Sequence, residues 1–222
     1  MHKKLIAALL SMVVVFSAIT TAHSGDIKGK VIIRSSGERE PAKGLSALYR
    51  KPGEHDMKAA PDTTSMQAVV FVQSFPGQPD PRSVDGAALA QKNEMFFPHI
   101  LPVTVGTTVD FPNRDDIYHN VFSFSKIKTF DLGRYAQGKS KSVTFDKPGI
   151  VEVFCEIHSL MHAYIVVVPN NFFTLTGEDG SFVIKDIPPG KHRITVWHEK
   201  FPVREITVTV PEQGEVEVNI EF

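Results

Sequence analysis

The chain has 222 residues, of which 42% are hydrophobic and 22% are charged, and its formal net charge is −1. This composition supplies enough apolar side chain for a packed core and excludes a disordered chain, and the absence of a long basic run argues against a nucleic-acid-binding protein. The single cysteine, Cys155, excludes an internal disulfide, a four-cysteine zinc site and an iron–sulfur cluster.

The first residues have the pattern of a secretory signal peptide. Two lysines precede the apolar run Leu5–Ile19, and the small residues Ala22 and Ser24 stand just before Gly25. We therefore predict that residues 1–24 are removed and that the mature protein is periplasmic. An uncleaved anchor helix is the alternative, but the apolar run is short for a membrane span of about 20 residues.

From Gly25 onward the hydrophobic pattern is that of β-strands separated by Gly, Pro, Asn and Asp. Several segments alternate between apolar and polar residues, which is typical of antiparallel sheets with one buried face. The predicted fold class is therefore all-β, and residues 35–66, which are polar and lack periodicity, are expected to form a surface excursion. Strands are expected at residues 27–33, 67–73, 103–111, 119–124, 142–145, 150–154, 164–168, 181–185, 193–197, 203–210 and 215–222.

Four side chains that suit a soft metal ion occur in two short segments. His119 opens an alternating strand, and Cys155 ends an apolar strand and is followed by His158 and Met161 at intervals of three. Two imidazoles with one thiolate and a weak axial thioether describe a blue-copper electron-transfer site. Zinc takes the same nitrogen and sulfur ligands, and a lone Cys or Met is often only a core residue, so both alternatives stay open.

These segments resemble the cupredoxins, and in particular their amicyanin-like members. The Cys-x-x-His-x-x-Met loop that starts at Cys155 has the amicyanin length, and the triplet at residues 119–121 is similar to the family's His-Asn-Val segment. The resemblance covers residues 94–169 and implies a Greek-key cupredoxin β-sandwich with one type 1 copper site. A similar modular pattern occurs in bacterial proteins named methylamine-utilisation proteins.

The resemblance also implies a role for each site residue. Asn120 would help to hold the cysteine loop, with its backbone N–H near the sulfur. His162 is a competing axial ligand, which we rank behind Met161 because the spacing of Met161 fits. The implied ligands are His119, Cys155 and His158, with Met161 as the weak axial one.

The last fifty residues are similar to another family, the carboxypeptidase regulatory-like domain, a small transthyretin-like β-sandwich. Asp179-Gly180 signals a hairpin between alternating strands, and a Pro-Pro-Gly turn follows at residues 188–190. The Gly-x-Ile-x-Gly-x-Val strand that opens this domain has a counterpart at residues 25–31. We therefore predict that the strand at 27–33 pairs within the C-terminal sandwich.

The predicted organisation has four parts. They are a signal peptide at 1–24, N-terminal strands and a surface loop of the regulatory-like sandwich at 25–92, a cupredoxin domain at 93–169 and the regulatory-like sandwich at 170–222. We expect a periplasmic electron carrier, not an enzyme, that passes single electrons between redox proteins through one copper ion. The exposed loop around His158 would dock partners through a rim of Ser159, Leu160 and Ala163.

Two other functions fit parts of the pattern. One is a copper-storage protein, or a sandwich that binds glycan or protein. The other is a copper oxidase, which would require cleavage after Ala22, because an N-terminal His23 can chelate copper through its amine and its ring.

Overall fold

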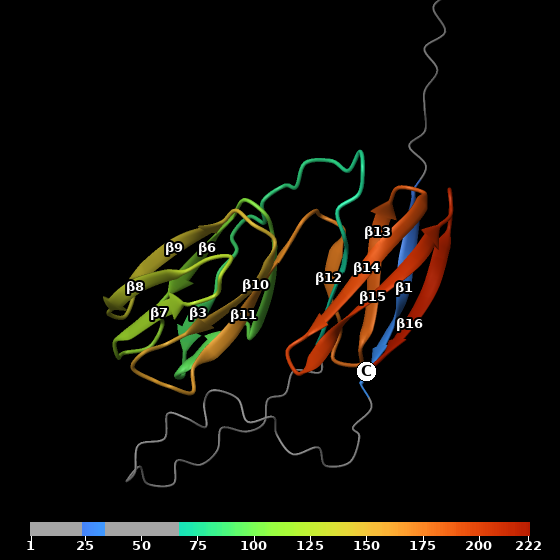
Figure 1. Ribbon diagram of the computed structural model, residues 1–222. Coiled ribbons are helices and arrows are strands. Elements are labelled where there is room, and N and C mark those ends of the chain that lie inside the picture. Colours follow the sequence, from blue (N-terminus) through green and yellow to red (C-terminus); the bar gives the residue numbers. More distant parts are fainter. Residues whose placement is uncertain (1–23, 34–66) are drawn as a thin grey trace, which may run out of the picture.

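The computed structural model describes residues 24–33 and 67–222. Every regular element among these residues is a strand, so the all-β prediction is confirmed. The predicted leader, His23 and the predicted surface excursion at 35–66 lie almost entirely outside the described residues. Figure 1 shows two β-sandwiches side by side. We call them the central sandwich, which contains β3 to β11, and the split sandwich, which contains β1, β2 and β12 to β16.

The central sandwich is built from one continuous stretch of chain. Its main sheet has the strand order β5-β11-β10-β7-β8, and the pairs β3-β4 and β6-β9 share the buried cluster with it. Short bridges from Ala88 to Asp110 and from Gln91 to Asn113 connect the segment around β3 to β6. Its strands are β3 (Ala90–Lys92), β4 (Met95–Phe97), β5 (Ile100–Thr104), β6 (Thr107–Pro112), β7 (His119–Ser123), β8 (Phe130–Tyr135), β9 (Ser140–Phe145), β10 (Gly149–Phe154) and β11 (His162–Val168).

One predicted strand of the central sandwich is wrong as a single element. The sequence predicted a continuous strand over 103–111, but the chain turns at Val105 and Gly106. Gly106 has φ of 88°, a left-handed conformation that glycine adopts without steric cost. The turn lets β5 join the main sheet beside β11, while β6 pairs with β9 in the opposite layer.

The split sandwich takes strands from both ends of the chain. β1 pairs antiparallel with β13 and parallel with β16, so the predicted pairing of the N-terminal strand within the C-terminal sandwich is confirmed. The second layer has the order β12-β2-β14-β15. The strands are β1 (Gly25–Ile32), β2 (Val69–Val72), β12 (Phe173–Leu175), β13 (Ser181–Ile187), β14 (Gly190–His198), β15 (Phe201–Val210) and β16 (Glu215–Glu221).

Close packing within this sheet requires glycine at position 29. A Cβ atom on Gly29 would lie 1.7 Å from the backbone oxygen of Val218 on β16. Any side chain there would separate β1 from β16. The second glycine of the Gly-x-Ile-x-Gly-x-Val strand, Gly29, therefore has a packing role in this sheet.

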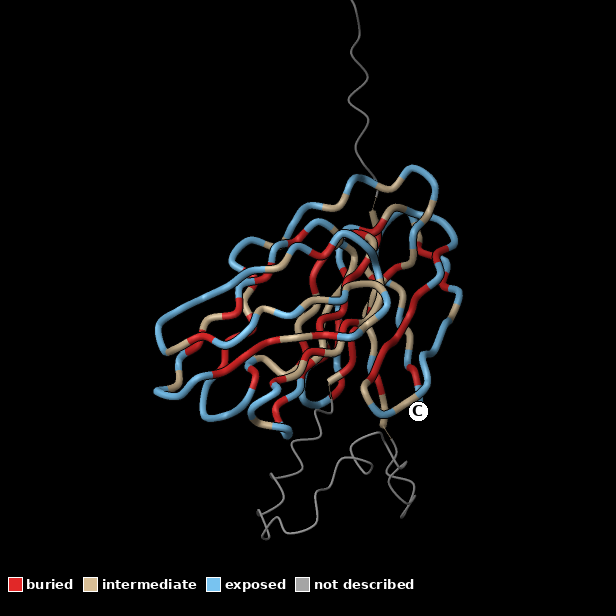
Figure 2. The backbone as a smooth tube through the Cα atoms, turned by 60° about the vertical axis from the view of Figure 1, so that its left-hand side comes forward, coloured by how far each residue is buried: buried red, intermediate tan, exposed pale blue. Residues whose placement is uncertain are grey.

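The two sandwiches share an apolar interface. Strand β11 is buried on both faces: Ala163 and Ile165 belong to the central core, whereas Val166 and Val168 face the split sandwich. A strand covered on both sides has an almost continuous apolar sequence, as β11 does. Figure 2 shows buried residues along the strands of both sandwiches. The interface cluster consists of Val69, Ile100, Val166, Val168 and Trp197, with Phe71, Ile150, Tyr164, Phe173 and Leu175 partly buried against it.

Candidate metal centre

The fold brings three of the predicted ligands together at one end of the central sandwich. His119 is the first residue of β7, Cys155 follows β10, and His158 lies in the loop between β10 and β11. The Sγ atom of Cys155 lies 3.8 Å from Nδ1 of His119 and 3.8 Å from Nδ1 of His158. The two Nδ1 atoms are 3.0 Å apart. These three atoms form a small triangle that is largely closed to solvent.

Each imidazole has a carboxylate on the side away from the triangle, and the closer of the two carboxylates determines which nitrogen of His119 faces Cys155. Nε2 of His119 lies 2.8 Å from Oδ2 of Asp115, and Nε2 of His158 lies 3.8 Å from Oε2 of Glu94. A carboxylate only accepts hydrogen bonds, so Nε2 of His119 carries the proton and Nδ1 presents a lone pair. Carboxylates that orient histidine rings in this way are usual partners of metal-binding histidines.

Asp115 is itself held in place by the turn between β3 and β4. Its carboxylate accepts the backbone N–H groups of Asn93 and Glu94, at 2.6 Å and 2.9 Å. Desolvation is the largest influence on the pKa of Asp115 and raises it. The hydrogen bonds from Glu94, His119 and Asn93 outweigh that effect and hold the pKa below its usual value of 3.8. Asp115 is therefore an anion at neutral pH.

The donor set fits a metal ion. Two imidazole lone pairs 3.0 Å apart repel each other unless a proton or a cation lies between them. A metal bonded to nitrogen at about 2.0 Å and to sulfur at about 2.3 Å in a trigonal arrangement separates S from N by roughly 3.8 Å. The distances from Cys155 to both histidines have this value.

Backbone and side-chain hydrogen bonds close the loop that carries Cys155. The N–H of Cys155 donates to the carbonyl of Met161 at 3.2 Å, and the N–H of Met161 donates to the carbonyl of His158 at 2.9 Å. Asn120 is buried, and its Oδ1 accepts the N–H of Glu156 at 2.6 Å while its Nδ2 donates to Asp131 at 3.1 Å. Asn120 thus links the start of the loop to β7 and β8.

Met161 and His162, the two candidates for the axial position, point in different directions. Met161 is 2% exposed and belongs to the same buried cluster as Cys155. His162 begins β11, where side chains alternate between faces, and it is exposed beside His99 and Glu199. Within the described residues, His162 is therefore grouped with a different set of donors from that of Cys155.

The predicted docking rim needs one correction. Leu160 is 60% exposed and Ser159 is also exposed, as expected for a surface loop. Ala163 is fully buried, because it is the first inward-facing residue of β11. It cannot contact a partner. Exposed apolar side chains that the sequence did not single out, Ile157 and Tyr118, lie next to the ligands along the chain.

A buried network of polar side chains lies beside β7. Tyr135 pairs with His119 across β7 and β8, and its hydroxyl donates to the carbonyl of Phe111 at 2.8 Å. Nε2 of Gln91 donates to the same hydroxyl at 2.6 Å. Burial raises the pKa of Tyr135 to about 12, so the phenol stays protonated.

Sequence reasoning missed the carboxylates behind the histidines. Asp115 stands four residues before His119, but nothing in that spacing distinguishes it from Asp116. Glu94 is 64 positions before His158, and only the β3–β4 turn brings it near. The two residues of that turn, Asn93 and Glu94, have φ of 55° and 56°, but they lack the Asn-Gly or Asp-Gly pair that usually signals a two-residue hairpin turn.

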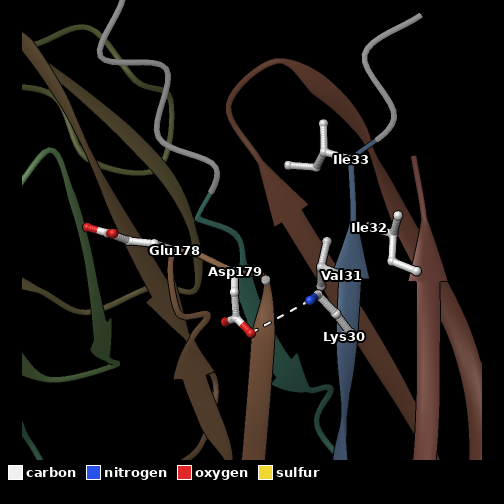
Figure 3. Close-up of a pocket in the computed structure, with 7 residues that line it drawn as sticks. Lys30, Val31, Ile32, Ile33, Glu178 and Asp179 are labelled. Atoms are coloured by element: carbon white, nitrogen blue, oxygen red, sulfur yellow. Dashed lines mark ion pairs between the residues drawn. The ribbon is translucent and has the colours of Figure 1, made fainter.

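A hollow elsewhere in the molecule lacks such a donor set. This hollow of about 250 Å³ lies at the end of β1. Figure 3 shows Lys30 and Asp179 beside it, and Nζ of Lys30 lies 3.7 Å from Oδ2 of Asp179. Both side chains are at least half exposed, so this ion pair is weak. Neither of the two possible metal-binding groups among the described residues includes a residue of this hollow.

No helix within residues 24–33 and 67–222, the part of the chain that the structure describes, is long and apolar enough to cross a membrane.

Comparisons with known proteins give matches among solved structures. No protein-family model matches the chain, and no curated protein matches it significantly. It is similar to a purple cupredoxin from Nitrosopumilus maritimus, at 22% identity, covering 36% of this chain and 98% of that one with a TM-score of 0.34. A reduced amicyanin mutant is 25% identical in sequence, and that match covers 40% of this chain and 95% of the amicyanin chain with a TM-score of 0.35. A copper-containing nitrite reductase from Thermus scotoductus SA-01 is 21% identical in sequence. That match covers 62% of this chain and 28% of the reductase chain, with a TM-score of 0.35.

Proposed function

We propose that this protein is a type 1 copper protein that passes single electrons between periplasmic redox proteins. One observation carries the proposal: two Nδ1 atoms and one Sγ form a closed triangle, and the opposite nitrogen of each ring faces a carboxylate. His119, Cys155 and His158 would be the strong ligands and Met161 the weak axial one. Copper held by this donor set exchanges one electron between its +1 and +2 states.

The chain's own residues account for the remaining requirements of an electron carrier. Asp115 and Asn120 hold the ligands in place, so the site is largely rigid before a metal binds. Catalysis at a metal needs an open coordination position. Three strong ligands and a buried Met161 leave little room for one, which favours electron transfer over an enzymatic reaction.

The surface near His158 suits a transient redox partner. The His158 side chain is 22% exposed, and the neighbouring Leu160 and Ile157 are exposed apolar residues. Weak redox encounters use small interfaces, which a short loop can supply. We infer that electrons leave through the His158 ring and that partners dock on this loop.

The wider organisation belongs to the same proposal. We infer a leader over residues 1–24, a cupredoxin domain over 93–169, and a carboxypeptidase regulatory-like sandwich over 170–222 completed by strands from 25–92. The order β13-β1-β16 supports this division, because the N-terminal strand lies between two C-terminal ones. Sequencing the N-terminus of the secreted protein tests the leader. A mature chain that begins at His23 and binds a second copper would instead support the oxidase alternative.

Copper titration of the purified protein tests the function. With Cu²⁺ the protein should bind one ion at this centre and absorb strongly in the visible, because thiolate-to-Cu(II) charge transfer is intense. Cys155→Ser should abolish the band, whereas Ser159→Ala, on the same loop, should keep it. A band that survives Cys155→Ser would contradict the proposal. A coloured site with very slow electron exchange would indicate copper storage instead.

A further inference from the structure

A second group of metal-binding side chains lies where the two sandwiches meet. The ligand atoms of His99, His162 and Glu199 all lie within 4.8 Å of one another. His99 lies between β4 and β5, His162 begins β11, and Glu199 lies in the turn between β14 and β15. Nε2 of His99 is 2.7 Å from Oε2 of Glu199. Both sandwiches therefore contribute donors to one point.

Aromatic packing places the two imidazoles beside the same tyrosine. The ring of Tyr164 meets His99 and His162 edge-on, with centroid distances of 5.7 Å and 6.0 Å. Tyr164 in turn packs against Trp197 of the interface cluster at 5.2 Å. The N–H of Tyr164 also donates to the carbonyl of His99 at 2.9 Å. The cluster thus stands on the apolar interface between the sandwiches.

The cluster combines one largely buried carboxylate with two imidazole rings. Nε2 of His99 faces the Glu199 carboxylate, and Nδ1 of His162 lies 3.3 Å from the carbonyl oxygen of Leu160. The Glu199 side chain is only 8% exposed. Desolvation is the largest influence on the pKa of Glu199 and raises it, but the hydrogen bond and the charges of the nearby histidines lower it overall. A largely buried carboxylate is thus kept ionised between two imidazoles.

We propose that His99, His162 and Glu199 form a second metal site, which binds Zn²⁺ and ties the split sandwich to the central sandwich. Two histidines and one glutamate are a common zinc ligand set, with water in the fourth position. Tetrahedral zinc with bonds of about 2.0–2.2 Å separates its ligand atoms by roughly 3.4 Å. The 2.7 Å between His99 and Glu199 is shorter than that value, because no ion lies between the two atoms, and all the ligand atoms lie within 4.8 Å of one another. Small side-chain rotations, which the exposed His162 permits, would complete the site.

The test uses the whole chain with the first centre disabled. In a Cys155→Ala/His158→Ala background, zinc titration by calorimetry should still find one bound ion, and zinc should raise the melting temperature. Adding Glu199→Gln, which keeps the size of the side chain, should weaken that binding at least tenfold and remove the thermal shift. Adding His162→Ala should do the same, and this side chain is exposed, so the fold is expected to tolerate the change.

Glu152→Gln is the matched control. Glu152 accepts the hydroxyl of Tyr164 at 3.3 Å beside the cluster but belongs to neither ligand group, so zinc binding should persist in this variant. If zinc does not bind, or if Glu199→Gln and His162→Ala leave the binding unchanged, the proposal is wrong and the cluster is only an ion pair between sandwiches. Because the background lacks Cys155, this result is independent of whether the first centre binds copper.

Discussion

Asp115 and His119 are joined by a 2.8 Å hydrogen bond between a carboxylate oxygen and the ring nitrogen that faces away from Cys155. The same carboxylate accepts both backbone N–H groups of the β3–β4 turn. The Glu94 carboxylate of that turn lies 3.8 Å from the ring of His158. The hairpin turn therefore positions Asp115, and through it His119, although it contributes no ligand.

Asp115→Asn should weaken copper binding without removing the site. An amide has one acceptor oxygen where the carboxylate has two, so at least one of the three hydrogen bonds is lost, together with a negative charge close to the metal. Changes in residues that orient a metal ligand typically cost 10–100-fold in affinity, and we expect a loss of about that size. The reduction potential should rise, because the lost charge stabilised Cu(II) more than Cu(I). Competitive copper titration and voltammetry measure the two effects.

Asp116→Asn provides the control for this change. Asp116 is exposed and next to Asp115, so its substitution removes a similar formal charge from the same segment between β6 and β7. It should leave copper affinity within a few-fold of the parent. Equal effects of the two substitutions would mean that general electrostatics, and not the bond to His119, explain the result.

The opposite burial of Met161 and His162 gives a prediction for the axial ligand. Met161 faces the buried cluster with Cys155, and His162 faces His99 and Glu199. Met161→Leu should keep the visible band and raise the reduction potential, because loss of a weak sulfur donor destabilises Cu(II) more than Cu(I). His162→Ala should change neither. Spectra and voltammetry of both variants decide the matter, and the reverse pattern would assign the axial position to His162.

The sequence predicted the strands and the metal-ligand candidates far better than it predicted their surroundings. His119, Cys155 and His158 are conspicuous because their donor types are rare and closely spaced. Asp115 and Glu94 are common surface residue types, and only the folded chain brings them behind the histidines. The difference in burial that separates Met161 from His162 is not visible in the sequence, because it depends on where β11 begins.

Long-range partners were harder still to predict. His99 and Glu199 are 100 positions apart and meet only because two sandwiches pack together. The short strands β3, β4 and β12 have three residues each, too few to show a periodic pattern. The pairing of β1 was predictable because its glycine pattern resembles the opening strand of a known small sandwich.

Gly29→Ala should destabilise the split sandwich. The added methyl group would lie 1.7 Å from a backbone oxygen of β16, which cannot move without breaking the sheet. Overpacking of this kind costs roughly 1–3 kcal/mol or more in the free energy of unfolding. Urea unfolding followed by circular dichroism measures the loss. Gly86→Asn is the control, because Gly86 has open space around it and asparagine tolerates its φ of 66°. A Gly29→Ala variant as stable as the parent would show that β1 and β16 are not packed this closely.

A fragment containing only residues 170–222 should not fold. β1 lies between β13 and β16, and β2 lies between β12 and β14, so the fragment lacks an interior strand from each layer of its sandwich. It also lacks the buried side chains of Ile27, Val31 and Val70 from its core. Exposed strand edges and a half-built core favour aggregation. We expect no cooperative thermal transition from the fragment, whereas a chain that joins residues 24–33 and 67–73 to it through flexible linkers should recover one. A cooperative melt of residues 170–222 alone would show that β1 and β2 are dispensable, and the split arrangement would then have no energetic role.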